Sequence, residues 1–248
     1  MLERTLSRFT LDMRQLLGQN LLEVIIHGSV VLGDFRPGRG DIDYVVITKD
    51  DLDEEVNQEI FRIHDRYRGS KELLLYQLEG PFYPRRAVMD LGSAFMGCYI
   101  GTTRRYWRAI TSFQNSLMDL AIIDRYGRRM LGTATPLYRP SSEEIHAEQV
   151  KDCGKLAASM QGREAPSMAD FVSTIHWCAR TIHYLRGGQI VSKGTACRWC
   201  HESPELDSFG ELFEYAQERR YPYEPRSADP AMVGACRALL DTVGRLLG

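Results

Sequence analysis

Residues 27–47 read HGSVVLGDFRPGRGDIDYVVI, in which two apolar segments flank a loop rich in Gly and Pro. The first segment ends at Gly28-Ser29, and the second begins with Asp41-Ile42-Asp43. Because side chains alternate between the two faces of a strand, Asp41 and Asp43 are expected to point the same way. Paired carboxylates next to a turn of small residues suit a Mg²⁺ ion that carries a polyphosphate, since Mg²⁺ is usually held by one or two carboxylates together with phosphate oxygens and water.

The Gly28-Ser29 turn is expected to contact the polyphosphate itself. Gly28 lets phosphate approach the backbone, and the Ser29 hydroxyl and neighbouring N–H groups can donate to it. The alternative is a β-hairpin whose two acids only face solvent. That alternative does not explain why Gly-Ser closes one strand and D-x-D opens the next, so the sequence favours a binding site.

The combination resembles the G-S…D-x-D signature of the nucleotidyltransferase superfamily that includes DNA polymerase β. Within it, the chain is similar to the aminoglycoside adenylyltransferases that inactivate streptomycin and spectinomycin. The resemblance implies Mg²⁺-dependent transfer of AMP from ATP to a hydroxyl of a cationic, aminoglycoside-like acceptor, with release of pyrophosphate. Two departures bear on the acceptor: Gly40 precedes Asp41 where the family usually has Ser, and the Ser29-to-Asp41 loop is one residue longer.

Hydrophobic periodicity predicts an α/β organisation for the first half of the chain. Gly80-Pro81 is expected to end the third strand, and the Pro-, Gly- and Arg-rich region 81–112 is expected to form a lid or substrate-facing loops. The predicted helices are 3–17, 53–67 and 113–126, and the predicted strands are 22–27, 42–48 and 72–79.

The second half is predicted to be helical. Residues 132–142 contain two prolines without periodicity and are expected to form a linker. Ser141-x-x-Glu144 and Ser167-x-x-Asp170 are capping boxes that open helices. Further helices are expected to begin at Ser192 and to span 207–219 and 229–247. The predicted fold class is therefore α+β, with a nucleotidyltransferase α/β domain at 1–135 and an all-helical domain at 136–248.

Glu79 is the candidate general base. A hydroxyl is a weak nucleophile at neutral pH, so a base or a metal ion must help remove its proton. Glu79 is the last residue of the third predicted strand, where the sheet would bring it beside Asp41 and Asp43, and the resemblance implies a catalytic glutamate at this point. Glu72, at the other end of the same predicted strand, is the alternative acid. If the three carboxylates converge, bound Mg²⁺ would relieve their repulsion.

In the helical half, the resemblance implies that Arg180 and Lys193 contact the triphosphate. The matching pattern is G-x-I-x-x-K-x-x-x-x-x-W, formed by Gly188, Ile190, Lys193 and Trp199. A lysine at the start of a helix is slightly disfavoured by the helix dipole. A bound phosphate would explain why one stands there, although a solvated lysine is the simpler alternative.

The resemblance also implies two contacts to the acceptor. Asp170 stands where these enzymes place an acid for the amine or guanidinium groups of the drug, but as the last residue of a capping box it could serve helix stability alone. Trp107 could pack on a sugar or cyclitol ring. Trp177 and His27 are expected to be packing residues without a catalytic role.

Composition describes an ordinary globular protein of 248 residues, 44% hydrophobic and 26% charged. The net charge of −2 argues against a nucleic-acid-coating protein. No apolar run is long enough to span a membrane, and charges interrupt the first 17 residues, so a cytoplasmic location with reduced cysteines is expected. A monomer is expected as well. Residues 197–201 spell the haem-attachment pattern C-x-x-C-H, but their helical pattern indicates core residues instead.

Two other functions remain open from the sequence. The same chemistry could act on a different acceptor, such as a protein side chain or the end of a tRNA. Alternatively, the chain could be a catalytically inactive module that senses nucleotide. The presence of Ser29, Asp41, Asp43 and Glu79 together argues against an inactive module.

Overall fold

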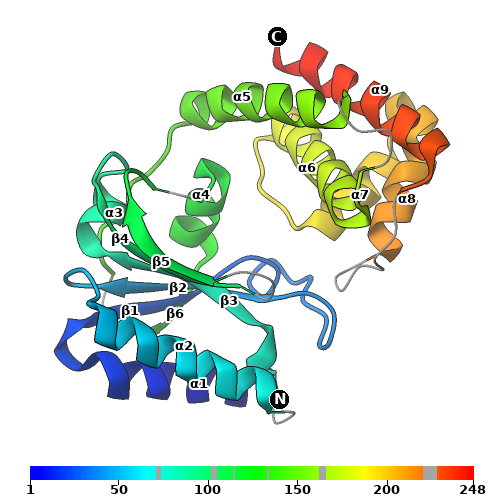
Figure 1. The fold of residues 1–248 in the computed structure, drawn as a ribbon. Coiled ribbons are helices and arrows are strands. Elements are labelled where there is room, and N and C mark those ends of the chain that lie inside the picture. The colour runs from blue at the N-terminus through cyan, green and yellow to red at the C-terminus, as the bar shows by residue number, and fades with distance from the viewer. Residues whose placement is uncertain (71–73, 102–104, 114, 133, 162–165, 220–227) are drawn as a thin grey trace. The chain divides into compact units, whose positions relative to one another are not determined.

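A computed structural model describes residues 1–70, 74–101, 105–113, 115–132, 134–161, 166–219 and 228–248 (Figure 1). The chain divides into two compact units, Met1–Arg139 and Pro140–Gly248. The division lies within the stretch 132–142 that the sequence marks as a linker, a few residues beyond the expected boundary at 135. Among the described residues, no helix has both the length and the apolar character needed to cross a membrane.

The first unit is built on a mixed sheet with the strand order β5-β4-β3-β2-β1-β6. β2 and β3 pair in parallel, whereas the other neighbouring strands pair antiparallel. The strands are β1 (Leu21–Ile26), β2 (Ile42–Thr48), β3 (Leu78–Pro84), β4 (Phe95–Ile100), β5 (Arg105–Ile110) and β6 (Arg128–Leu131).

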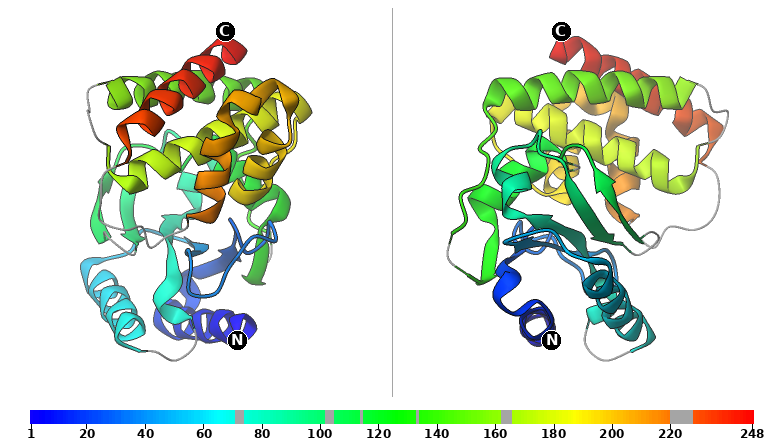
Figure 2. Two further views of the ribbon diagram at one scale, coloured as in Figure 1. Left: turned by 90° about the vertical axis from the view of Figure 1, so that its right-hand side faces the viewer. Right: turned by 60° about the vertical axis from the view of Figure 1, so that its left-hand side comes forward.

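Helices cover both faces of this sheet. On one face lie α1 (Leu2–Leu17) and α2 (Glu54–Gly69), side by side in Figures 1 and 2, and their apolar stripes pack on alternate strand residues such as Tyr44 and Phe82. On the other face, α3 (Arg85–Met89) and α4 (Leu117–Tyr126) pack against Val45 and Ile47. Short 3₁₀ turns at Gly18–Asn20 and Leu75–Gln77 precede β1 and β3.

The third strand corrects the prediction from sequence. β3 begins at Leu78 and continues through Gly80-Pro81, whereas the prediction ended it there. A Cβ at Gly80 would lie 1.9 Å from the carbonyl oxygen of Tyr44, so this glycine permits close strand packing and does not break the strand. Gly80 and Pro81 have register partners on β4 but none on β2. The proline, which has no N–H, therefore stands at a gap in the β2–β3 pairing.

The prediction of a lid or substrate-facing loops for 81–112 was wrong, because the described part of this region is mostly strand and helix. It contains the end of β3, then α3, β4 and β5. A Cβ on Gly97 of β4 would lie 2.4 Å from the Ile110 side chain of β5, so this glycine permits close packing of the two strands. β5 is at the edge of the sheet and largely exposed, so it lacks the apolar pattern of an inner strand.

The second unit consists of helices, as predicted. They are α5 (Ser142–Gln161), α6 (Met168–Gly187), α7 (Lys193–His201), α8 (Gly210–Glu218) and α9 (Pro230–Leu247), with a 3₁₀ segment at Pro204–Phe209. The capping box before α5 is complete, since the Ser141 N–H donates to Glu144 Oε2 at 2.8 Å and the Glu144 N–H donates to Ser141 Oγ at 3.1 Å. α6 ends at Gly188, which has the left-handed conformation of a helix C-cap.

The cysteines of the C-x-x-C-H pattern are core residues. Cys197 and Cys200 on α7 are fully buried among apolar side chains of α6, α8 and α9, and Cys200 Sγ donates to the Ala179 carbonyl at 3.7 Å. Burial raises the pKa of the Cys200 thiol to about 12. A group held as a neutral thiol is a poor metal ligand, which supports the packing role inferred from the sequence.

Candidate active site

The end of β1 and the start of β2 bring Gly28 against Asp43. The His27 N–H donates to the Asp43 carbonyl at 3.0 Å, which continues the β1–β2 pairing by one residue. Gly28 then turns with a φ of 63°, and a Cβ built on it would lie only 2.1 Å from Asp43 Oδ2. The Asp43 carboxylate therefore rests against bare backbone, and Gly28 is required by this contact as well as by its conformation.

The residues after Gly28 form a single turn. The Leu32 N–H donates to the Gly28 carbonyl at 3.1 Å, and the Asp34 N–H donates to the Ser29 carbonyl at 2.9 Å. In a turn of this kind, the N–H groups that come before the first donating N–H have no acceptor within the turn and can donate to another group. This arrangement suits the Gly28-Ser29 turn to phosphate oxygens, as the sequence predicts.

Asp43 and Glu79 are direct partners in the parallel β2–β3 register. Adjacent strands lie about 4.8 Å apart, and partners at one register position project from the same face. Asp41 lies immediately before β2, and all three carboxylates are half-buried. The sheet thus brings Glu79 beside the aspartate pair. Glu72, the alternative acid, lies outside the described residues.

A tyrosine that the sequence did not single out contacts Glu79. The Tyr99 hydroxyl, from β4, donates to Glu79 Oε1. The Tyr99 ring stacks on Tyr106 of β5, with centroids 5.5 Å apart and planes at 16°, and these two residues are cross-strand partners. Only recognition of the β4–β5 hairpin could have revealed this pair in the sequence, because neither tyrosine belongs to a local motif.

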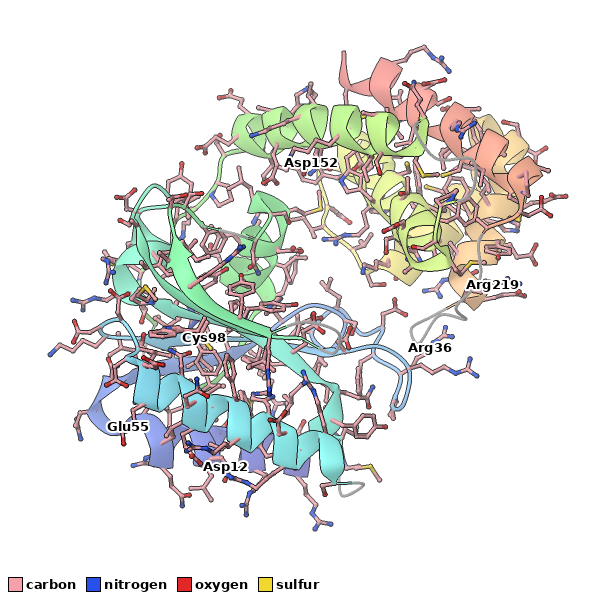
Figure 3. All side chains as sticks on the ribbon, in the orientation of Figure 1. Asp12, Arg36, Glu55, Cys98, Asp152 and Arg219 are labelled. Carbon is pink, nitrogen blue, oxygen red and sulfur yellow. The ribbon has the colours of Figure 1, made fainter. Side chains whose placement is uncertain are left out.

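The loop between the two strands is fixed next to Asp41. The buried amide of Gln77 accepts from the Gly38 N–H at 3.0 Å and donates to the Gly40 carbonyl. Both contacts hold the last residues of the loop before β2. Arg36 lies at the outer end of this loop (Figure 3). Gly40 has a φ of 101°, a conformation that favours glycine over the Ser usual in the family.

Trp107 does not belong to this group, which corrects its interpretation as an acceptor contact. It is the register partner of Cys98 and packs with the apolar residues beneath α1 and α2. Asp43 and Glu79 alternate onto the opposite face of the sheet. Tyr106, the residue before Trp107, packs on that opposite face. Trp107 therefore lies on the face of the sheet away from the three carboxylates.

His27 directly precedes the Gly28 turn in the chain and is buried. Burial lowers the pKa of His27 to about 4, against the opposing influence of Asp119 on α4. The imidazole is therefore neutral at physiological pH and adds no charge beside the carboxylates. This agrees with a packing role.

The donor set fits a cation that shares its coordination with a substrate. Asp41, Asp43 and Glu79 supply only carboxylate oxygens, which Mg²⁺ prefers. Within the described parts of the chain, no cluster of three or more His, Cys, Asp or Glu residues is arranged to hold a metal ion. Two or three carboxylates suit an ion whose remaining ligands are phosphate oxygens and water.

The second unit holds the other three candidates. Arg180 is half-buried on α6, Lys193 is exposed at the first position of α7, and Asp170 is exposed in the first turn of α6. The Asp170 N–H donates to Ser167 Oγ at 3.1 Å, so the N-cap expected before α6 is formed. The roles of the three side chains stay predictions.

Residues 6–80 match the family model described as the nucleotidyltransferase domain. This segment contains the Gly28 turn and all three carboxylates, and the match supports a nucleotidyltransferase enzyme. The whole chain also shares its fold with the crystal structure of spectinomycin adenyltransferase AAD(9) from Enterococcus faecialis with ATP and spectinomycin. The TM-score is 0.69 at 14% identity, over 99% of this chain and 98% of that one. No curated protein sequence matches significantly.

Proposed function

We propose that the protein is an ATP- and Mg²⁺-dependent adenylyltransferase that acts on a hydroxyl of a cationic, aminoglycoside-like small molecule. The pairing of Asp43 with Glu79 beside the Gly28-Ser29 turn carries this proposal. It would supply metal-binding carboxylates, a phosphate-binding turn and a base where β1 ends and β2 and β3 begin. The fold shared with a spectinomycin adenyltransferase supports a small-molecule acceptor.

The proposed reaction is a nucleotidyl transfer. The acceptor oxygen forms a bond to the α-phosphorus of ATP, the bond from that phosphorus to the bridging oxygen of the β-phosphate breaks, and pyrophosphate leaves. Glu79 accepts the proton of the acceptor hydroxyl. The N–H groups of the Gly28-Ser29 turn hold the phosphate oxygens in place.

Asp41 and Asp43 are the proposed Mg²⁺ ligands, with Glu79 as a further carboxylate of the site. Bound Mg²⁺ would stabilise the charge on the attacking and leaving oxygens. Mg²⁺ held by these carboxylates would take its remaining ligands from the phosphate oxygens of ATP and from water. Cation binding and nucleotide binding are therefore expected to be coupled.

The helical unit is proposed to supply specificity. Arg180 and Lys193 would contact the triphosphate, since both are cations and the Lys193 ammonium is exposed at a helix start where an anion is favourable. Asp170 would pair with an amine or guanidinium of the acceptor, because its position in the first turn of α6 leaves it exposed.

We also propose a cytoplasmic location and a monomeric state. All six cysteines, Cys98, Cys153, Cys178, Cys197, Cys200 and Cys236, are free and buried thiols. Free thiols are usual in a reducing compartment, and ATP is supplied there as co-substrate. The role of such an enzyme would be antibiotic inactivation.

The test is label transfer. Purified protein is incubated with Mg²⁺, ATP labelled at the α-phosphate and a panel of aminoglycosides and aminocyclitols, and both labelled acceptor and pyrophosphate are measured. Labelled drug with equal pyrophosphate supports the proposal. Label on protein or on tRNA, with none on the drugs, would redirect it to a different acceptor. MgATP binding without any transfer would indicate a nucleotide-binding module.

A further inference from the structure

A row of polar and aromatic side chains crosses four strands on the carboxylate face of the sheet. Asp43 on β2 pairs with Glu79 on β3, and Glu79 accepts the hydrogen bond from Tyr99 on β4. Tyr99 in turn stacks on Tyr106 of β5, and the Arg108 guanidinium lies 4.8 Å from the centre of the Tyr106 ring. Asp43 and Glu79 are neighbours by register, and from Glu79 onward each side chain contacts the next, so the row links the site carboxylates to the edge of the sheet.

We infer that Tyr99 is a positioning residue for Glu79, which holds the carboxylate in the orientation that accepts the proton of the acceptor hydroxyl. This inference rests on the proposed function. The Tyr99 hydroxyl engages Oε1, and we assign the incoming proton to Oε2. Tyr99 itself touches neither substrate nor reacting atoms in this scheme.

The need for a positioning residue follows from the flexibility of glutamate. Its side chain has three rotatable bonds, and holding it in one rotamer costs conformational entropy at the moment of reaction unless a partner has already fixed it. A hydrogen bond to a carboxylate is charge-assisted and directional, and so restricts those bonds. Small displacements of a catalytic group are costly, since misplacement by about 1 Å can reduce a rate by about 100-fold.

Tyr99 is itself well fixed. Its ring is held from one side by the stacked Tyr106, and its backbone is paired on both sides, with Pro81 of β3 and with Tyr106 of β5. The register places Tyr99 opposite Pro81, two residues beyond Glu79, so the hydroxyl reaches Glu79 diagonally across the same face of the sheet. A rigid donor on a regular strand can define the position of a flexible acceptor.

The chain offers a matched control on the opposite face of the sheet. The Tyr67 hydroxyl, from α2, donates to Asp12 of α1. This is the same phenol-to-carboxylate bond, but it joins two helices and contacts none of the three site carboxylates. Tyr67→Phe therefore removes an equivalent hydrogen bond without touching the site.

The experiment compares Tyr99→Phe with Tyr67→Phe in the full-length protein, using an acceptor found by label transfer. Phe keeps the stacked ring and removes only the hydroxyl. We expect Tyr99→Phe to lower kcat by about 10- to 100-fold, to change the KM for MgATP by less than about 2-fold, and to lower Tm no more than Tyr67→Phe does. Tyr67→Phe should leave kcat unchanged.

A double mutant then tests whether Tyr99 acts through Glu79. In the Glu79→Gln background, Tyr99→Phe should have no further effect on kcat, because the group that it positions can no longer accept a proton. Additive losses would overturn the inference, as would a normal kcat for Tyr99→Phe or a loss of activity matched by a larger fall in Tm. A wild-type protein that transfers no label to any acceptor would overturn both this inference and the proposed function, whereas an active wild type with a normal Tyr99→Phe variant would overturn this inference alone.

Discussion

The carboxylate of Asp43 lies against the backbone of Gly28, so that a Cβ on Gly28 would come within 2.1 Å of Asp43 Oδ2. This contact joins the two halves of the G-S…D-x-D signature in space. It explains why a glycine closes the first strand and an aspartate opens the second. The turn that would hold phosphate and the carboxylate that would hold the metal ion are adjacent because Gly28 has no side chain to separate them.

Gly28→Ala should abolish transfer, because the added methyl group must displace the Asp43 carboxylate. Gly33→Ala is the matched control. Gly33 lies in the same loop with a similar φ of 72°, but nothing lies within 4 Å of its Cβ position. Both variants should lose about 1 kcal/mol of stability from the positive φ, whereas only Gly28→Ala should lose about 100-fold or more in kcat. Equal activities of the two variants would show that the contact has no functional importance.

Asp43→Asn and Asp41→Asn should each reduce kcat by about 10³-fold or more, since charge stabilisation by bound metal contributes several kcal/mol to the transition state. Asp50→Asn is the control, because Asp50 is exposed beyond the far end of β2. Pyrophosphate release measures turnover, and calorimetric titration with MgATP measures binding. Release near the wild-type rate from either site variant would remove these aspartates from the metal site.

Glu79→Gln separates the base from the metal ligands. Gln keeps the size of the side chain and an oxygen that can accept from Tyr99, so the fold and MgATP affinity should persist while transfer falls by about 10²–10⁴-fold. Glu72→Gln, at the alternative acid, should leave transfer intact. A collapse of MgATP affinity in Glu79→Gln would instead make Glu79 a metal ligand first.

The fold and site were predictable from sequence where local patterns were strong. The amphipathic spacing of α1 and α2, the β-branched runs of β1 and β2, and the Ser caps of α5 and α6 each depend on neighbours along the chain. Glu79 was expected beside the aspartate pair and is the register partner of Asp43, but it stands near the start of β3 and not at the end of a strand 72–79.

What the sequence did not reveal depends on contacts between strands. Gly80 and Gly97 signal a break when read locally, yet each permits a close approach to Tyr44 or Ile110 that only the folded sheet displays. The short edge strand β6 carries two arginines and has no apolar pattern of its own. The orientation of Trp107 depends on the register with β4, and a shift of one residue exchanges it with Tyr106.

Stability should fall below pH 6.5 because of two buried histidines in the first unit. Burial lowers the pKa of His27 to about 4 and that of His64 to about 3, with Arg68 adding to the shift at His64 and Asp65 opposing it. The unfolded chain therefore binds protons near pH 6.5 that the native protein binds only at lower pH. Each histidine should make the free energy of unfolding decrease by at most about 1.4 kcal/mol per pH unit between pH 6.5 and its native pKa.

Chemical denaturation at pH 7, 6 and 5 measures this slope. In His64→Gln, which keeps a partner for the Tyr44 hydroxyl that lies 3.2 Å from His64 Nε2, the slope should shrink by the contribution of one proton. An identical pH dependence in the wild type and His64→Gln would mean that His64 titrates normally in the native state.

Asp170 has two possible roles, helix stability and acceptor binding, because it stands in the capping turn of α6 and is also exposed to solvent. If Asp170 pairs with a cationic acceptor, Asp170→Asn should raise the acceptor KM by about 10- to 100-fold, since a charge-assisted contact contributes roughly 1.5–3 kcal/mol. The KM for ATP should not change. If Asp170 serves only the helix, the variant should lose about 0.5–2 kcal/mol of stability and keep its acceptor KM.

Ser167→Ala separates these outcomes, because Ser167 Oγ accepts from the Asp170 N–H and caps the same helix without presenting a charge. It should lower Tm while leaving both Michaelis constants near the wild-type values. A selective rise in the acceptor KM for Asp170→Asn, absent from Ser167→Ala, would assign the carboxylate to substrate binding. A fall in Tm shared by the two variants, with unchanged acceptor KM, would make Asp170 part of the scaffold and direct the search for the cation-binding group to other acids of the helical unit.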